Sequence, residues 1–167
     1  NIFEPENPGT KIVKDVPEQR KIIKSIAYRK GQIILNITST KMLMQSGFLG
    51  RVFDIFARHK VIIDMVATSE ISISLTTDSF NGLNESIREI EKFSSVTLNT
   101  DRAVIAVVGE GMKTHKGIAG KVFTIVSRSG VNIEMISFGA SRVNLAFIVK
   151  AEDVETAVRA LHKNLFE

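Results

Sequence analysis

Two stretches of the chain repeat each other and decide the fold. The first reads Gly47-Phe-Leu-Gly-Arg-Val-Phe-Asp-Ile-Phe-Ala-Arg-His-Lys-Val-Ile-Ile-Asp-Met65, and the second, seventy residues later, reads Gly117-Ile-Ala-Gly-Lys-Val-Phe-Thr-Ile-Val-Ser-Arg-Ser-Gly-Val-Asn-Ile-Glu-Met135. Nine of the nineteen aligned positions are identical, far more than chance would give. Solenoid repeats have periods of roughly 20–50 residues. The longer period therefore predicts two copies of a small domain.

Each copy is predicted to contain the same order of strands and helices. In the first copy, β-rich and alternating segments predict strands at 33–39, 61–68, 71–77 and 95–99. Apolar residues at helical spacing predict one helix over 47–59 and another that opens at Asn81-Gly82. The order β-α-β-β-α-β is that of the ferredoxin-like split unit, an α+β fold.

The second copy lacks its fourth strand. Its predicted strands are 103–108, 131–138 and 143–149, and its predicted helices are 117–129 and 152–163. A spare strand lies upstream at 21–28, and we expect it to complete the second copy, which would otherwise have an unpaired edge. The first domain, 31–100, would then be inserted into the second, which combines 21–30 with 101–167. Residues 1–20 hold all three prolines and are predicted to be a linker, because the chain starts like a piece of something larger.

Side chains alternate along a strand, so the predicted strand 61–68 has two faces. The residues that recur unchanged in the other copy are expected to lie under the helices, and the residues that differ are expected to face away. The recurring set is Val61, Ile63 and Met65, repeated as Val131, Ile133 and Met135, and the differing set is Ile62, Asp64 and Val66. Because an apolar face without a cover favours association, a dimer or higher assembly is expected.

Composition excludes several classes of function. The 167 residues carry a net charge of +4 and no cysteine, which excludes disulfides, thiolate metal sites and a cysteine nucleophile. No run of eighteen apolar residues and no secretory signal are visible, so a membrane partner is not expected and the cytoplasm is the expected compartment. With one Tyr, no Trp and no long basic run, the chain is not expected to bind nucleic acid.

No active site or metal site is recognisable. Gly109-Glu-Gly111 follows a strand, but the third glycine of a dinucleotide turn would stand at 114, where the chain has Thr. The three histidines are not at metal-ligand spacing. The chain is therefore expected to have no catalytic residues, no metal and no cofactor of its own.

A small ligand could bind beside the loop 40–48. Ser46 is a candidate N-cap, and the amides of 47–49 would form an anion site at the positive end of the helix, or would simply bind water. Asp64 could pair with an ammonium group or could be only a solvated surface residue, and Ser69 and Glu70 follow at the next turn. Apolar walls could come from Met42, Phe48, Leu49 and Ile63, although alternation makes Ile63 a core residue. This combination describes a cationic amino acid such as lysine, whereas the second copy has Glu134 and Gly139-Ala140 at the matching positions.

Several of these segments resemble one known family. The runs Met42-Leu-Met-Gln-Ser-Gly-Phe-Leu49, Ala67-Thr-Ser-Glu-Ile-Ser-Ile-Ser-Leu75 and Met135-Ile-Ser-Phe-Gly-Ala-Ser-Arg-Val-Asn144 are similar to the regulatory half of lysine-sensitive aspartate kinases. In that family the region is a tandem of ACT domains, with one domain inserted into the other. The resemblance covers nearly the whole chain.

The resemblance implies feedback control of an enzyme. The parent kinase would phosphorylate aspartate with ATP and Mg in a kinase domain of the same chain, which is absent here, so this fragment is not expected to catalyse. Lysine would bind where the ACT domains of a homodimer meet. The positions that match the family site are Met42, Gly47, Phe48, Leu49, Ile63, Asp64, Ser69 and Glu70.

Two other functions stay open at this point. The chain could be a ligand-free ACT scaffold whose role is oligomerisation. It could also sense threonine, although threonine has no distal ammonium group to pair with Asp64.

Overall fold

Two long strands, β1 (Ser25–Thr38) and β4 (Ser95–Val108), run through both halves of the molecule. The computed structural model describes residues 22–44, 46–140 and 143–167. The other strands are β2 (Met65–Thr68), β3 (Ser72–Thr77), β5 (Met135–Phe138) and β6 (Asn144–Lys150), and the α-helices are α1 (Phe48–Arg58), α2 (Leu83–Ile90), α3 (Ile118–Arg128) and α4 (Val154–Phe166). Short 3-10 helices cover Thr40–Met44, Glu110–Lys113 and Ala151–Asp153. All strands join one antiparallel sheet in the order β2-β3-β1-β4-β6-β5.

The pairing of β1 with β4 connects the two copies. The second half of β1, Ile33–Thr38, pairs with β3 and with residues 95–99 of β4. The first half, Ser25–Lys30, pairs with residues 103–108, the first strand of the second copy. The four strands predicted at 21–28, 33–39, 95–99 and 103–108 are therefore two continuous strands, β1 and β4. The predicted α+β fold of two β-α-β-β-α-β copies is confirmed. On this pairing we propose the domains 31–100 and 21–30 plus 101–167, while the predicted linker 1–20 lies outside the described residues.

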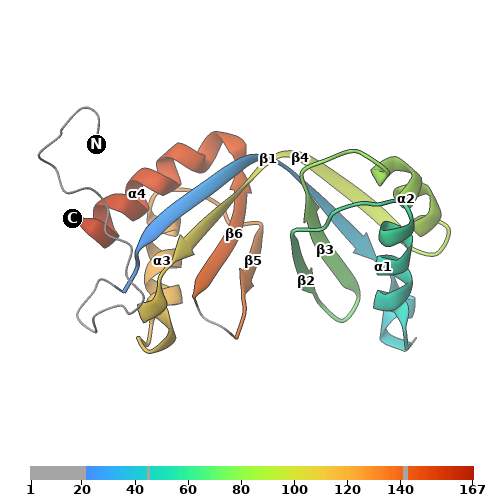
Figure 1. Ribbon diagram of the computed structural model, residues 1–167, viewed down its shortest axis with the longest axis horizontal. Helices are drawn as coiled ribbons and strands as arrows, with labels where there is room; N and C mark the ends of the chain where they lie inside the picture. Colours follow the sequence, from blue (N-terminus) through green and yellow to red (C-terminus); the bar gives the residue numbers. More distant parts are fainter. Residues whose placement is uncertain (1–21, 45, 141–142) are drawn as a thin grey trace, which may run out of the picture.

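Both long strands bend where one copy ends and the other begins. Gly31 has a φ of 78° and Asp101, seventy residues later, has a φ of 58°, and the register of the ladder shifts beside Gln32. A left-handed backbone suits Gly and is tolerated by Asp, so the two residues allow matching bends. The result is two lobes with their helices on the outer sides and the hairpins β2–β3 and β5–β6 facing each other (Figure 1).

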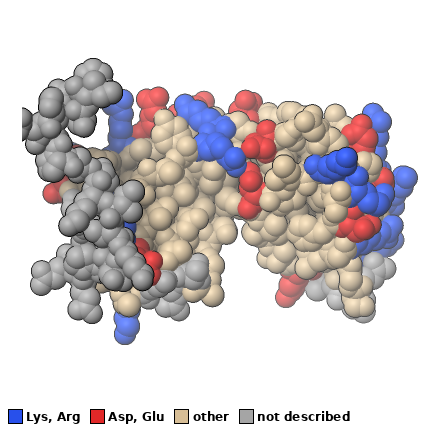
Figure 2. Space-filling view, in the orientation of Figure 1, with Lys and Arg blue, Asp and Glu red and all other residues tan. Residues whose placement is uncertain are grey.

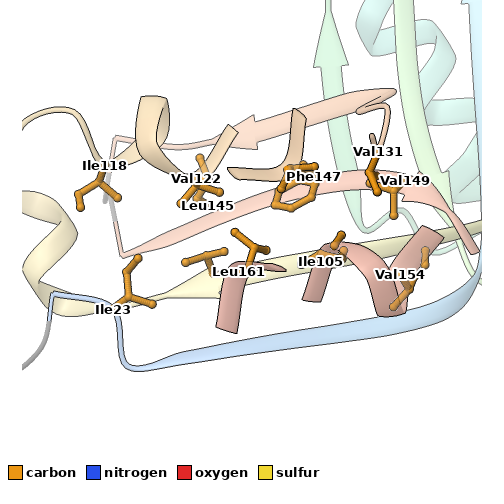
Figure 3. Close-up of a cluster of buried hydrophobic side chains, with 14 of the residues drawn as sticks. Ile23, Ile105, Ile118, Val122, Val131, Leu145, Phe147, Val149, Val154 and Leu161 are labelled. Carbon is orange, nitrogen blue, oxygen red and sulfur yellow. The ribbon is translucent and has the colours of Figure 1, made fainter. Parts of the chain in front are cut away.

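Each lobe has its own core between its helices and its part of the sheet. In the second lobe, Val122 of α3 and Leu161 of α4 share one cluster with Ile105 and Phe147 of the sheet, and all four are fully buried (Figure 3). The first lobe repeats this arrangement with Val52, Ile55, Leu35 and Leu75 among its buried residues. None of the described helices has the length and apolar character needed to cross a bilayer.

A third cluster lies between the lobes and corrects the predicted faces of strand 61–68. Met65 and Met135 are buried there with Ile34, Ala146 and Ile148, on the sheet face opposite the helices. The prediction that these methionines lie under the helices was wrong, because residues 61–64 and 131–134 precede the strands and break the alternation. Opposed residues share a face, so the pairs Met65–Thr76 and Thr76–Ile34 put Met65 on the inner face.

The other residues of that segment divide differently from the prediction as well. Val66 pairs with Leu75 and so lies on the helix side, where it is exposed at the sheet edge. Val61 and Ile63 do contact the helix-side core, as predicted. Ile62 is 72% exposed and faces away from the core, also as predicted.

Gly109 and Gly111 have a packing role. A Cβ at Gly109 would lie 2.1 Å from the carbonyl oxygen of Ile22, and one at Gly111 would lie 2.7 Å from the Cα of Ile22. The segment before β1 therefore rests directly on these two glycines. Close backbone approach explains the Gly-Glu-Gly sequence without any nucleotide.

Two helices of the first lobe are joined by an ion-pair cluster that makes stability depend on pH. Glu89 accepts hydrogen bonds from Arg58 Nη2 at 2.9 Å, and its other oxygen lies 2.7 Å from His59 Nε2. Arg58, and then His59, lower the pKa of Glu89 to about 2 from an ordinary 4.5. Since the unfolded state then binds more protons between these values, the contribution of Glu89 is complete above pH 4.5 and is lost as the pH falls toward 2.

Glu89→Gln is expected to flatten the pH dependence of the free energy of unfolding between pH 4.5 and 2, because it removes the group whose pKa changes on folding. Urea unfolding at several pH values would measure this. Glu155→Gln, which removes the α4 pair with Arg159 at 3.8 Å, is the control and should keep the wild-type slope. An unchanged slope in Glu89→Gln would contradict the prediction.

Candidate functional site

The loop before α1 ends in a glycine that opens the helix. Gly47, with a φ of 82°, is the N-cap residue, and Arg51 N donates to its carbonyl at 3.0 Å. The prediction that Ser46 is the N-cap was wrong, because the left-handed glycine takes that position. A glycine has no side chain to accept from the first amides of the helix, so these donors are left for water or a ligand.

The predicted apolar walls divide into core and surface. Phe48 is only 5% exposed and packs edge-to-face on Phe93, with ring centroids 5.8 Å apart. Met42 and Ile63 are half-buried against the same core. Leu49 is the member of the predicted set that extends furthest into solvent. Met42 and Phe48 therefore lie under the loop, whereas Ile63 contacts the same core from just before β2, at the end of the strand away from the loop.

The carboxylate of Asp64 already has a partner. Arg29 pairs with Asp64 through Nη2 and with Asp78 through Nη1, the latter at 3.0 Å. Asp64 stands just before β2, and its amide donates to the Thr76 carbonyl at 2.9 Å. Arg29 is contributed by the half of β1 that pairs within the second lobe. Figure 2 shows basic and acidic side chains gathered where the lobes meet.

The turn between β2 and β3 is closed by its own serines. The hydroxyls of Ser69 and Ser72 lie 2.7 Å apart, and the Ser69 amide donates to the Ser72 carbonyl at 2.9 Å. Glu70 is exposed at the tip of this turn. The structure therefore places Ser69 and Glu70 on a hydrogen-bonded turn, with the Glu70 side chain exposed.

The second lobe contains a pocket at the matching place. It has a volume of about 450 Å³ and is lined by Met112, His115, Lys116, Gly117, Ile118, Ala119, Phe138, Gly139 and Ala140. Seventy residues earlier, the same positions are 42, 45–49 and 68–70. The second lobe therefore builds a hollow from a loop, a helix start and a hairpin turn, and the matching region of the first copy is where the ligand site is predicted.

Sequence reasoning missed Arg29 as a partner of Asp64. The two are 35 positions apart, and the ladder that brings them together crosses between copies. The signal for this pair in the sequence was the inserted topology. It predicts that the strand at 21–28, which Arg29 follows directly, lies beside the first copy.

Comparison with known proteins agrees with this geometry. Residues 105–165 match the model of the ACT domain family. A solved structure from Porphyromonas gingivalis, assigned as a C-terminal regulatory domain of aspartate kinase, is 33% identical, with a TM-score of 0.77 over 88% of this chain and 100% of that chain. The chain belongs to the C-terminal ACT regulatory regions of aspartate kinases.

Whole enzymes are similar to this regulatory region over part of their length. Aspartokinase 1, chloroplastic, of Arabidopsis thaliana is 40% identical over 100% of this chain and 31% of its own length. Lysine-sensitive aspartokinase 3 of Escherichia coli is 35% identical over 98% of this chain and 38% of its own length. The regulatory region thus spans about a third of these relatives. The structure of E. coli aspartokinase III in complex with lysine and aspartate has a TM-score of 0.78 and 34% identity, over 91% of this chain and 35% of that chain.

Proposed function

We propose that this ACT regulatory region binds lysine and so inhibits the phosphorylation of aspartate by a kinase domain of the same chain. The observation that carries the proposal is the uncapped helix start at Gly47 beside the turn that bears the exposed Glu70. Lysine has one carboxylate and two ammonium groups, and two copies of this lobe in a dimer would offer amides for the former and acids for the latter. A relative described as lysine-sensitive and a similar structure with bound lysine support the choice.

Within the proposed site each group has one role. The first amides of α1 donate hydrogen bonds to the lysine carboxylate, and Glu70 and Asp64 face the ammonium groups in the assembled homodimer. Leu49 covers the methylene chain of the lysine, while the half-buried Met42 supports the loop from beneath. The proposed contact set is Met42, Gly47, Phe48, Leu49, Ile63, Asp64, Ser69 and Glu70.

A homodimer through the ACT domains completes the site. The edge strand β2 and its neighbours expose Ile62, Val66 and Ile71, at 72%, 37% and 40%. An exposed edge with apolar residues favours pairing with a second copy. The partner would cover this edge and exclude water from Asp64, which strengthens its pairing with an ammonium group.

Inhibition requires that lysine bind one state of the kinase better than the other. Such couplings are typically about 1–3 kcal/mol per site. Two sites in a dimer would together shift the equilibrium by about 2–6 kcal/mol, enough to change a mostly active enzyme into a mostly inactive one. The compartment stays a prediction: the composition indicates the cytoplasm, whereas three plant relatives are named chloroplastic.

Calorimetry with lysine, threonine and methionine tests the proposal. Heat from lysine and none from threonine is the expected result. Heat from threonine alone would favour the threonine sensor, and heat from none would favour the ligand-free scaffold. Sedimentation with and without lysine would test the dimer in the same samples.

Arg29→Gln is expected to tighten lysine binding, because Arg29 and the lysine ammonium compete for Asp64. Exposed ion pairs are worth about 0.2–1 kcal/mol, so the dissociation constant should fall by about 1.5- to 5-fold. Arg102→Gln is the matched control, since it breaks the 2.8 Å pair with Glu134 in the other lobe and should leave the affinity unchanged. Weaker binding in Arg29→Gln would contradict the competition.

A further inference from the structure

We propose that the pocket of the second lobe binds a neutral amino acid with an apolar side chain, separately from lysine. The amino-acid chemistry of this inference rests on the proposed function, because the pocket is the repeat equivalent of the lysine site. Its volume of about 450 Å³ lies in the range of small-ligand pockets. The first and second lobes would then respond to different amino acids.

The charges of the pocket favour a carboxylate. Lys116 and His115 line it together with Gly117 and Ile118 at the start of α3, and none of the nine lining residues that the structure describes is acidic. Gly117 has a φ of 81° and, like Gly47, no side chain to accept from the first helical amides. A cation and uncapped amides on one side of a hollow suit one anionic group.

Among the described residues, the same pocket has no acid for a distal ammonium group. Gly139 and Ala140 stand where the first lobe has Ser69 and Glu70. The equivalent of Asp64 is Glu134, which accepts from Arg102 Nε at 2.8 Å and does not line the pocket. The side chains of that pair are only 21% and 18% exposed, so the carboxylate is held away from a ligand. Lysine would therefore leave a charge unpaired here, at a high cost in free energy.

The remaining walls are apolar. Met112 and Ile118 form the buried side of the pocket, and Phe138, which replaces Thr68 of the first lobe, is 39% exposed beside it. β5 is an edge strand, so its outer carbonyls are available to an α-ammonium group. A leucine or methionine side chain would contact these walls and cover the exposed part of Phe138.

Calorimetry on the chain saturated with lysine tests this inference, with leucine and methionine as the probes. We expect one further binding event per chain for at least one probe, and no such event for added lysine. Absence of heat from both probes would overturn the inference while leaving the lysine result intact.

Two substitutions, one in each lobe, show where the leucine or methionine probe binds. Lys116→Glu should weaken probe binding at least tenfold and leave the lysine isotherm unchanged, which also shows that the variant is folded. Glu70→Ala is the reciprocal variant, and it should weaken lysine binding without changing probe binding. Probe heat that survives Lys116→Glu would assign it to another site and overturn the inference. Probe binding without any lysine binding would instead contradict the proposed function alone.

Discussion

Replacement of Asp64 with asparagine is expected to weaken lysine binding by on the order of 2–4 kcal/mol, or roughly 30- to 1,000-fold in the dissociation constant. The amide keeps the size of the side chain and removes its charge. In the lysine complex, with a second subunit over the β2 edge, the ammonium would then be desolvated without a counter-ion. That loss is larger than the effect of an exposed ion pair, which is why the expected change exceeds that of Arg29→Gln.

Two variants separate the possible causes of such a loss. Asp64→Asn also breaks the pair with Arg29, but Arg29→Gln breaks the same pair and keeps the carboxylate. Glu134→Gln makes the equivalent change in the second lobe and should leave lysine binding unchanged. Calorimetry that finds wild-type affinity in Asp64→Asn would remove Asp64 from the site.

Replacement of Gly82 with alanine is expected to lower the free energy of unfolding by on the order of 3–5 kcal/mol. Gly82 caps α2 with a φ of 69°, and a Cβ there would lie 2.0 Å from the carbonyl oxygen of His59, the residue that ends α1. The clash is with backbone, which no rotamer change can relieve. The two helices would have to move apart, and the contact between His59 and Glu89 would be strained with them.

Gly130→Ala is the matched control for this change. Gly130 has a φ of 79°, but nothing lies within 4 Å of a Cβ built there. The alanine is then destabilising only because its backbone is left-handed, and the free energy of unfolding should fall by about 1–2 kcal/mol. Equal losses in the two variants, measured by urea unfolding, would show that the close approach to His59 has no energetic effect. Lys60, the repeat equivalent of Gly130, already adopts a φ of 58°, so the position tolerates a side chain.

Local patterns in the sequence were sufficient to predict the helices and the order of helices and strands along the chain. The predicted helices 47–59 and 117–129 are observed as Phe48–Arg58 and Ile118–Arg128, because their apolar stripes and their glycine starts are local signals. The spare strand was found by counting strands against a repeat. Its pairing with 103–108 depends on a ladder that only the folded chain contains.

Other features depended on contacts between distant segments. Alternation counted from residue 61 assigned Met65 to the wrong face, since the chain joins the sheet only at Met65. Ser46 had the chemistry of an N-cap, but the backbone of Gly47 ends the loop one residue later. Neither difference can be read from residue types, because both depend on where the backbone begins to pair.

By itself the sequence determined the duplication, the two helix-and-sheet cores and the difference between the acidic turn of the first copy and the Gly-Ala turn of the second. These follow from residue types at repeated spacings, which are local. Only the tertiary structure decided that β1 and β4 are shared, that two methionines meet between the lobes and that Arg29 reaches Asp64. The physical reason is that strand pairing joins residues far apart in the chain, and the bends at Gly31 and Asp101 set which faces and charges then come together.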